Sequence, residues 1–236
     1  MANKHDFPNI CGLLWSSGNG QRVGTGFLIG PRHVLTVGHN LFDPKVNPYP
    51  HWSQNVFAYF PGSGPDVGPV IVPATAIDVH PRWKPDSFTS LGHLSAYDFG
   101  MVILRDAPAL RPFSLEEPED PPRLAVVGYP KAASSGGLFQ WIGAFNQGVV
   151  ACPDPAYAYR LYYPPMYLPP TAIEGMSGGP AYRIDENGMP IRDANGRVLA
   201  VGVQSSWVGF ANGPLASAVA IYDDGIRPVI RAWLEL

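Results

Sequence analysis

Short apolar runs, separated by turn-forming residues, dominate the pattern of the chain. Most are of strand length and rich in Val, Ile, Leu or aromatic residues, as in "GTGFLIG", "HVLTVGH", "NVFAYF", "FGMVILR", "LAVVGY" and "VLAVGVQSSWV". Helical periodicity between the runs is scarce, which disfavours an α/β protein, because that class alternates strands with helices. The pattern therefore predicts an all-β fold, either a pair of barrels or a sandwich.

Only the end of the chain has a clear helical pattern. In "DDGIRPVIRAWLEL", Ile226, Ile230 and Trp233 recur at helical spacing. We expect a C-terminal α-helix over residues 224–235, with these three side chains on its buried face.

The composition favours many short strands joined by stiff loops. The 236 residues include 27 prolines and 26 glycines, which interrupt helices and form turns. Apolar residues make up 46% of the chain, which is ample material for a core. The segments "DENG" and "DANG" are interpreted as hairpin turns rather than calcium loops, because the spacing of an EF-hand is absent.

The charge pattern argues against two classes of partner. Only 15% of the residues are charged, the net charge is -3, and Lys and Arg are scattered, so we expect no nucleic-acid partner. No apolar run approaches the roughly 18 residues of a membrane span, so we expect no membrane partner either. The first residues lack an apolar stretch behind a basic start, which predicts a cytoplasmic protein unless an export signal was removed.

Cys11 and Cys152 are the two cysteines of the chain. They could form one disulfide or remain as two free buried thiols. We favour free thiols, because small disulfide-stapled domains usually carry more cysteines. No two histidines stand at i, i+4, and no cysteine or carboxylate cluster completes a zinc site, so we expect neither a metal nor a cofactor.

Ser177 stands in the glycine-rich segment "EGMSGGPAY", residues 174–182. The segment fits the G-x-S-x-G pattern of α/β-hydrolases, but that fold needs a histidine later in the chain, and none follows residue 93. The order His, Asp, Ser of another class of serine hydrolase is possible. His39 ends the apolar run "HVLTVGHN", and Asp98 opens "YDFGMVILRD".

These segments resemble the trypsin-like serine peptidases. The resemblance rests on "GTGFLIGPRHVLTVGHN", "VHPRW", "YDFGMVIL", "GMSGGP" and "VGVQSSW", which follow one another in the order of that family. The short loops and few cysteines look most like its glutamyl-endopeptidase (V8-like) branch. The resemblance implies two packed antiparallel six-stranded β-barrels: residues 1–115 with His39 and Asp98, a linker at 116–123, and residues 124–236 with Ser177.

The resemblance also implies a role for each residue. His39 takes the proton of the Ser177 hydroxyl, Asp98 orients the imidazole, and the backbone N–H groups of Gly175 and Ser177 form an oxyanion hole. Rival candidates for the base and its partner remain open: His33, His51, His80 and His93, and Asp78 and Asp106.

The expected substrate pocket does not match a trypsin-like or a glutamate preference. By position, Thr171 and Ala172 form its floor, and no aspartate is present there to bind Lys or Arg. Glu174 lies at its mouth and would repel acidic side chains. The expected wall consists of Gln204, Ser205, Ser206 and Trp207. Gln204 or Ser205 occupies the place of a pocket histidine that V8-like enzymes use to bind glutamate.

Met176 replaces the aspartate that precedes the nucleophile in many relatives. Methionine cannot pair with a freshly cut N-terminal amine, so we expect no activation by that ion pair.

The sequence thus predicts a serine endopeptidase that hydrolyses polypeptides through an acyl-enzyme. The alternatives are a catalytically silent binding or scaffold protein of the same fold, and an esterase that uses the same residues.

Overall fold

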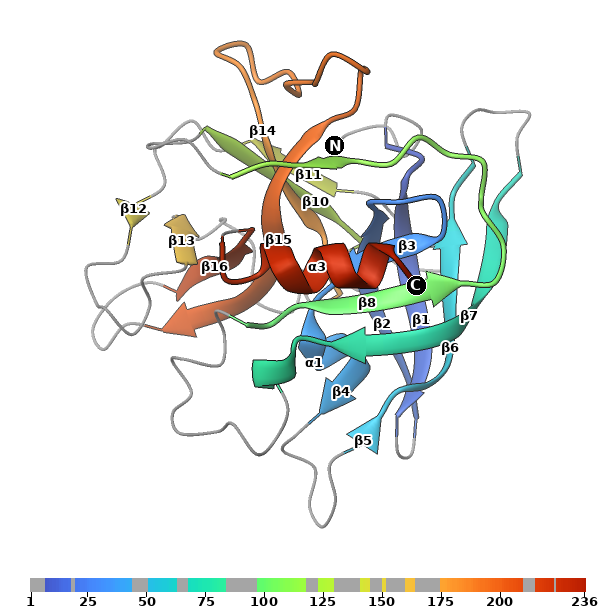
Figure 1. Cartoon of the computed structure of the whole chain (residues 1–236). Helices are drawn as coiled ribbons and strands as arrows, with labels where there is room; N and C mark the ends of the chain where they lie inside the picture. The colour runs from blue at the N-terminus through green and yellow to red at the C-terminus, as the bar shows by residue number, and fades with distance from the viewer. Residues whose placement is uncertain are drawn as a thin grey trace.

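The computed structural model describes most of the chain. It covers residues 7–17, 20–43, 51–62, 68–83, 97–117, 123–129, 141–144, 150–151, 160–163, 175–209, 215–222 and 224–236. Strands form nearly all of its regular structure and are arranged in two main sheets (Figure 1). The all-β prediction is confirmed.

The first sheet is a closed antiparallel barrel with the strand order β1-β2-β3-β8-β7-β6. Its strands are β1 (Ile10–Ser17), β2 (Gly20–Leu28), β3 (His33–Thr36), β6 (Gln54–Phe60), β7 (Val70–Val79) and β8 (Gly100–Leu104). All six contribute buried apolar side chains to one cluster, for example Leu13, Val34 and Val102. The apolar runs in the first half of the sequence therefore form the barrel that they predicted.

The second sheet contains eight strands among the described residues, where we expected a barrel of six. Its path runs β11-β10-β14-β15-β16-β13-β12, and β9 pairs in parallel with β15. The strands are β9 (Ser114–Leu115), β10 (Leu124–Gly128), β11 (Trp141–Ala144), β12 (Val150–Ala151), β13 (Arg160–Tyr163), β14 (Pro180–Arg183), β15 (Leu199–Gly209) and β16 (Leu215–Ile221). Because β9 joins this sheet, the connection between the two units begins inside it. The domain limits given above stay a prediction.

Three short elements complete the fold. A two-stranded ribbon of β4 (Phe42–Asp43) and β5 (His51–Trp52) follows the one-turn helix α1 (Gly38–Leu41), and the 3-10 helix η1 (Pro81–Trp83) follows β7.

The "DENG" and "DANG" segments are turns: the side chains of Asp185 and Asp193 accept hydrogen bonds from backbone N–H groups two and four residues ahead.

A second apolar cluster joins the two sheets and the C-terminal helix. Phe27 and Met101 of the barrel, Tyr182 and Val203 of the second sheet, and Ile230 of the helix all belong to it. Burying a side chain of this size contributes about 1.5–3 kcal/mol. The two units thus share one core, which fixes the loops at their junction.

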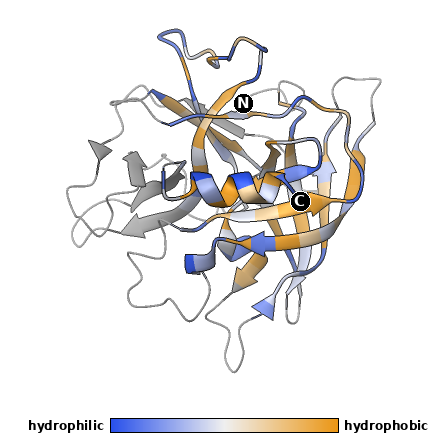
Figure 2. Cartoon of the chain, viewed as in Figure 1, coloured by the Kyte–Doolittle hydropathy of each residue, from blue (hydrophilic) through white to orange (hydrophobic). Residues whose placement is uncertain are grey.

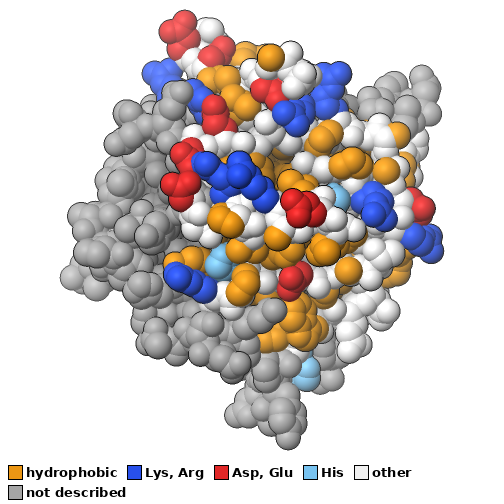
Figure 3. All heavy atoms as spheres, in the orientation of Figure 1, with side chains coloured by type: hydrophobic (Ala, Val, Ile, Leu, Met, Phe, Trp, Pro, Cys, Tyr) orange, Lys and Arg blue, Asp and Glu red, His pale blue; other side chains and the backbone are white. Residues whose placement is uncertain are grey.

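Helix α3 (Arg227–Leu234) lies within the predicted range. Ile230 and Trp233 are its buried side chains, and Figure 2 shows hydrophobic and hydrophilic residues alternating along it, as expected for an amphipathic helix. The indole Nε1 of Trp233 donates to Asp78 Oδ2 at 3.0 Å, so the helix is anchored on β7 of the barrel. Around it, Lys and Arg side chains lie among Asp and Glu side chains (Figure 3). In the part of the chain that is described, no helix has the length and apolar character needed to cross a membrane.

Cys11 is a free cysteine buried in the barrel. The free-thiol interpretation is therefore confirmed for Cys11, and Cys152 lies outside the described residues. Burial raises the pKa of the Cys11 thiol far above its ordinary value, against a smaller lowering effect of hydrogen bonds with the backbone of Gly26 and of Cys11 itself.

We expect Cys11 to be unreactive toward an aromatic disulfide reagent in the native protein at pH 8. Reaction needs a thiolate and access, and the buried Cys11 offers neither. Peptide mass mapping after a timed exposure identifies which cysteine carries the label. In guanidinium chloride Cys11 should react at once, which serves as the control. Labelling of native Cys11 as fast as in denaturant would contradict the buried position.

Candidate active site

The backbone of β3 and α1 places His39 at the edge of the barrel. β3 pairs with β2 and β8, Val37 continues in extended backbone, and α1 then turns the chain at Gly38. A Cβ atom on Gly38 would lie 2.7–3.0 Å from the indole ring of Trp83, so the residue before His39 has to be small. The position of His39 is thus set by strand pairing and by one tight contact.

His39 and Asp98 are joined by two hydrogen bonds. His39 Nδ1 lies 2.8 Å from Asp98 Oδ2, and the backbone N–H of His39 donates to Asp98 Oδ1 at 2.9 Å. The side chain of Asp98 is 2% exposed, whereas that of His39 is 36% exposed. A buried carboxylate therefore fixes the orientation of an imidazole that solvent and a ligand can reach.

The Asp98 carboxylate is held in its charged form. Burial by itself would raise its pKa, but the positive charge of His39, the hydrogen bonds from the His39 ring and the Ser205 hydroxyl, and the bond from the His39 backbone act in the opposite direction. The net result is a pKa below the ordinary value for aspartate. The anion can therefore stabilise an imidazolium at neutral pH.

Ser177 lies in a loop whose glycines are required by geometry. Gly175 has φ +98° and Gly178 has φ +92°, a region that other residues rarely adopt. A Cβ atom on Gly178 would lie 2.1 Å from the carbonyl oxygen of Thr25. The loop therefore packs against the barrel so tightly that no side chain fits at Gly178.

Three consecutive carbonyl groups of this loop, from Gly175 to Ser177, accept hydrogen bonds within the protein. Gly175 O accepts from Thr25 Oγ1 at 2.7 Å, Met176 O from the Gly179 N–H at 3.0 Å, and Ser177 O from the Thr25 N–H and from Asn40 Nδ2, both at 2.9 Å. In a trans peptide the N–H points opposite to the preceding carbonyl. The N–H of Ser177 therefore faces away from Met176 O. Among the described residues we find no acceptor for the N–H of Gly175 or of Ser177.

Ser205 of β15 bridges the serine loop and the His39–Asp98 pair. Its hydroxyl donates to Asp98 Oδ2 at 2.6 Å, and its carbonyl oxygen accepts from Ser177 Oγ at 3.2 Å. Asn40, which follows His39, also contacts the Ser177 carbonyl. The structure thus brings His39, Asp98 and Ser177 into one hydrogen-bonded cluster at the junction of the two units.

Solved structures with a similar fold are serine proteases. No protein-family model and no curated protein matches the sequence. A thermostable serine protease, AL20, from an extremophilic microorganism has a TM-score of 0.63 and 16% identity, with 95% of each chain covered. The protease Anisep from Arthrobacter nicotinovorans has a TM-score of 0.67 and 14% identity, over 98% of this chain and 97% of that one. A Glu endopeptidase has a TM-score of 0.65 and 19% identity, over 100% of this chain and 95% of that one.

The fold is that of the trypsin-like serine proteases. The predicted resemblance is thereby confirmed at the level of the fold, and a Glu endopeptidase is among the similar structures.

Within this trypsin-like fold, the rival residues have other contacts. Asp78 accepts from the N–H of Val79 and from Trp233. His80 stacks on Tyr97 with the ring centroids 4.9 Å apart. Burial is the main cause that lowers the pKa of His80 to about 4. A hydrogen bond with the Gly225 backbone opposes this shift, and the charge of Arg82 adds a smaller lowering effect. A histidine with so low a pKa is a weak general base at neutral pH.

Of the remaining rivals, the structure describes His33, His51 and Asp106. His33 is buried in β3, where burial lowers its pKa, with a further contribution from the charge of Arg32. His51 lies in β5, and Asp106 pairs with Arg105 on the surface. His93 lies outside the described residues.

The predicted pocket is described only in part. Gln204 lies beside the serine loop, since its carbonyl accepts from the Gly178 N–H at 2.7 Å and its N–H donates to Gly179 O at 2.8 Å. Thr171, Ala172 and Glu174 lie outside the described residues, and for Ser206 and Trp207 only the place in β15 is given. The preference for a substrate side chain therefore stays a prediction.

Sequence reasoning missed three contacts of this site. Ser205 was expected only as part of the pocket wall, which stays a prediction, and its hydroxyl donates to Asp98. Thr25 and Asn40 hold the serine loop and were not among the candidates. Asn40 follows His39 directly, and a polar residue at the end of the apolar run "HVLTVGHN" is the signal that could have drawn attention to it.

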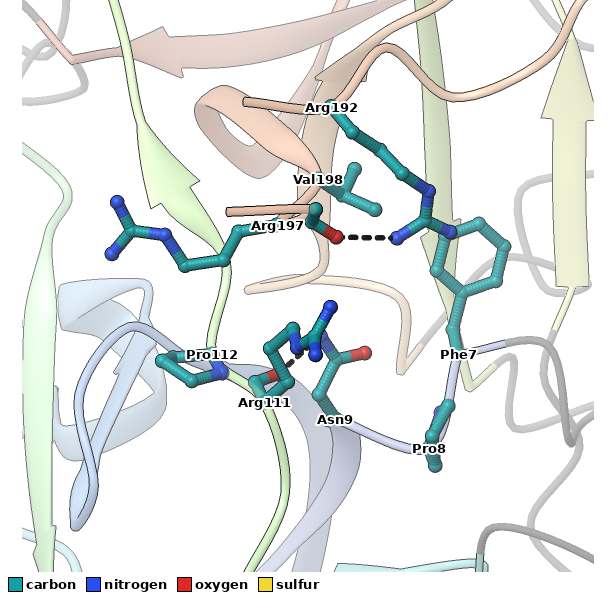
Figure 4. Close-up of a pocket in the computed structure, with 9 residues that line it drawn as sticks. Phe7, Pro8, Asn9, Arg111, Pro112, Arg192, Arg197 and Val198 are labelled. Atoms are coloured by element: carbon teal, nitrogen blue, oxygen red, sulfur yellow. Dashed lines mark hydrogen bonds between the residues drawn. The ribbon is translucent and has the colours of Figure 1, made fainter. Parts of the chain in front are cut away.

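A pocket of about 120 Å³ lies elsewhere on the molecule and contains none of the candidate catalytic residues. It is lined by Phe7, Pro8, Asn9, Arg111, Pro112, Arg192, Gly196, Arg197 and Val198. In Figure 4, Arg192 donates to the Gly196 carbonyl at 3.0 Å, and Arg197 points away from the pocket. Arg197 is bound to Asp193 at 2.7 Å. The pocket is therefore a surface hollow separate from the His39–Asp98 pair.

Proposed function

We propose that the protein is a serine endopeptidase that acts through an acyl-enzyme. The observation that carries the proposal is the hydrogen-bonded cluster in which a buried Asp98 orients His39 beside the Ser177 loop. The trypsin-like fold of the chain supports it, because similar structures at 14–19% identity are named as proteases. Fold alone does not establish activity, so the proposal depends on the residues of the cluster.

In the first half of the reaction, Ser177 Oγ attacks the carbonyl carbon of a peptide bond. Its proton passes to Nε2 of His39, since Nδ1 is directed to Asp98. The Ser177 hydroxyl now donates to Ser205 O, and rotation about its Cβ–Oγ bond redirects the proton. The electron pair of the attacked carbonyl moves to its oxygen, where the N–H groups of Gly175 and Ser177 stabilise the negative charge.

In the second half, His39 returns the proton to the leaving amine as the C–N bond breaks. An acyl group is then esterified to Ser177. A water molecule attacks this ester while His39 takes one of its protons, and the carboxylic acid leaves as the proton returns to Ser177. Asp98 stays ionised throughout and stabilises the imidazolium in both halves.

A fluorophosphonate probe is expected to label Ser177 and no other serine. The activated hydroxyl displaces fluoride, which leaves Ser177 phosphonylated, and peptide mass spectrometry locates the added mass. Ser177→Ala and His39→Ala should remove the label. Ser16→Ala, which changes a serine of β1 in the opposite barrel, is the matched control and should keep it.

The labelled protein should also cleave a mixed peptide library. Folded protein that takes no label would contradict the proposal and favour a silent scaffold. Labelling together with hydrolysis of esters but not of peptides would contradict the peptidase assignment while keeping the acyl-enzyme chemistry.

A further inference from the structure

Two buried polar side chains, Thr25 of β2 and Asn40 of α1, bind backbone carbonyls of the loop that contains Ser177. Thr25 is 0% exposed and Asn40 is 3% exposed. Thr25 contacts the loop at two points, because its hydroxyl donates to Gly175 O and its backbone N–H donates to Ser177 O. Asn40 adds a second donor to Ser177 O through its carboxamide. The carbonyl of the nucleophile thus receives two hydrogen bonds from one barrel.

Both side chains are themselves fixed by further hydrogen bonds. The Thr25 hydroxyl accepts from the N–H of Tyr129 at 2.9 Å, so its single proton is directed to Gly175 O. Asn40 Nδ2 donates also to Thr36 Oγ1 at 3.0 Å, and Thr36 in turn donates to Thr25 O at 2.7 Å. Each donor therefore has one orientation, and the group spans β2, β3 and α1.

The surrounding backbone leaves room for this arrangement and for little else. A Cβ atom on Gly24 would lie 2.5 Å from Asn40 Nδ2, and one on Gly178 would lie 2.1 Å from Thr36 Oγ1. Cβ atoms essentially never come so close to other heavy atoms, so these two glycines make space for the carboxamide and for the loop.

We propose that Thr25 and Asn40 are positioning residues of the proposed hydrolysis. They bind the carbonyls of Gly175 and Ser177, which belong to the peptide planes on either side of the one that carries the Ser177 N–H. With both flanking planes fixed, and with Met176 O of the middle plane bound by the Gly179 N–H, the N–H of Ser177 is held toward the developing oxyanion. The inference rests on the proposed function and adds to it the groups that preorganise the oxyanion hole. A loop without these anchors would place its donors less accurately, and small misplacements of this kind cost up to roughly 10²-fold in rate.

Thr25→Val tests the hydroxyl with little change in shape. We expect kcat to fall roughly 10–100-fold, with KM changed by less than about 3-fold, because the oxyanion forms only in the transition state. Binding of a peptide boronate, which imitates the tetrahedral intermediate, should weaken by a similar factor. Thr25→Ser restores the hydroxyl and should recover most of kcat. The pH profile of kcat/KM should not move, since His39 and Asp98 are untouched.

Asn40→Ala and Thr75→Val complete the set. Asn40→Ala removes the second donor to Ser177 O and should lower kcat about 10-fold, and it keeps the inference testable if Thr25→Val does not fold. Thr75→Val is the matched control, because Thr75 also donates to a barrel carbonyl, that of Ile103 at 3.2 Å. It should change thermal stability by a similar amount and leave kcat unchanged.

The outcomes separate this inference from the proposed function. Wild-type protein that fluorophosphonate does not label would overturn both. Wild-type labelling together with folded Thr25→Val and Asn40→Ala variants as fast as Thr75→Val would overturn the positioning role alone. An equal loss of kcat in Thr75→Val would show that the effect is general destabilisation, and would likewise overturn it.

Discussion

Replacing Ser177 with alanine is expected to lower kcat/KM for a cleaved peptide by roughly 10⁶, and His39→Ala should have an effect of similar size. Ser177 supplies the nucleophile, and without His39 its hydroxyl proton has no acceptor as the bond to the substrate forms. The measurement is initial-rate kinetics on a fluorogenic peptide chosen from the library digest. The small activity that remains should come from substrate binding and the oxyanion hole alone.

The double variant gives the sharper test. If Ser177 and His39 act as one unit, the second substitution should remove almost nothing beyond the first. Two independent losses that multiply would contradict a shared step. Ser16→Ala, purified in the same way, controls for contaminating proteases, and circular dichroism should show unchanged β-structure in all variants.

The barrel and the helix were predictable because their signals are local. The run "FGMVILR" is a continuous apolar stretch of strand length, rich in Val, Ile and Leu, and it forms β8, which is buried along its whole length. Ile230 and Trp233 stand at helical spacing, and both are buried in α3. The glycines around Ser177 predicted an unusual backbone conformation, and the positive φ angles of Gly175 and Gly178 confirm it. In each case a few neighbouring residues contain the information.

The support of the candidate site was not predictable in the same way. The hydrogen bond between Ser205 and Asp98 joins residues 107 positions apart, and that between Thr25 and Gly175 joins residues 150 apart. A serine in a strand and a threonine beside a glycine have no distinctive local pattern. Their partners are set by how the second sheet docks on the barrel through the shared core. The parallel pairing of β9 with β15 depends on the same docking, and the sequence pattern does not reveal it.

Asp98→Asn is expected to lower kcat roughly 10⁴-fold near neutral pH, in line with the general behaviour of such triads. Asp98 accepts from the His39 ring, the His39 backbone and the Ser205 hydroxyl. Asparagine has one carbonyl oxygen and an NH₂ group that only donates, so at least one of these donors loses its acceptor. If the amide NH₂ faces the ring, Nδ1 must become the acceptor, and Nε2 then carries the proton that it should receive from Ser177.

The same substitution should change how stability depends on pH. The pKa of Asp98 in the folded protein lies below its ordinary value, so the folded state favours the carboxylate. Its contribution is therefore present above the unfolded pKa of about 3.9 and is lost as the pH falls through the folded value. Urea unfolding between pH 3 and 7 should show wild type and Asp98→Asn differing most above about pH 5 and converging in acid.

Asp106→Asn is the matched control for both measurements. Asp106 pairs with Arg105 on the surface, with its side chain 68% exposed, and exposed pairs contribute little to stability. That variant should keep wild-type kcat and a nearly unchanged pH dependence of unfolding. If Asp98→Asn kept wild-type kcat, the His39–Asp98 hydrogen bond would be a structural contact only. If its free energy of unfolding stayed parallel to that of wild type from pH 3 to 7, the lowered pKa of Asp98 would be wrong. The kinetic result tests the orientation of the imidazole, and the unfolding result tests the charge of the carboxylate, so each can fail without the other.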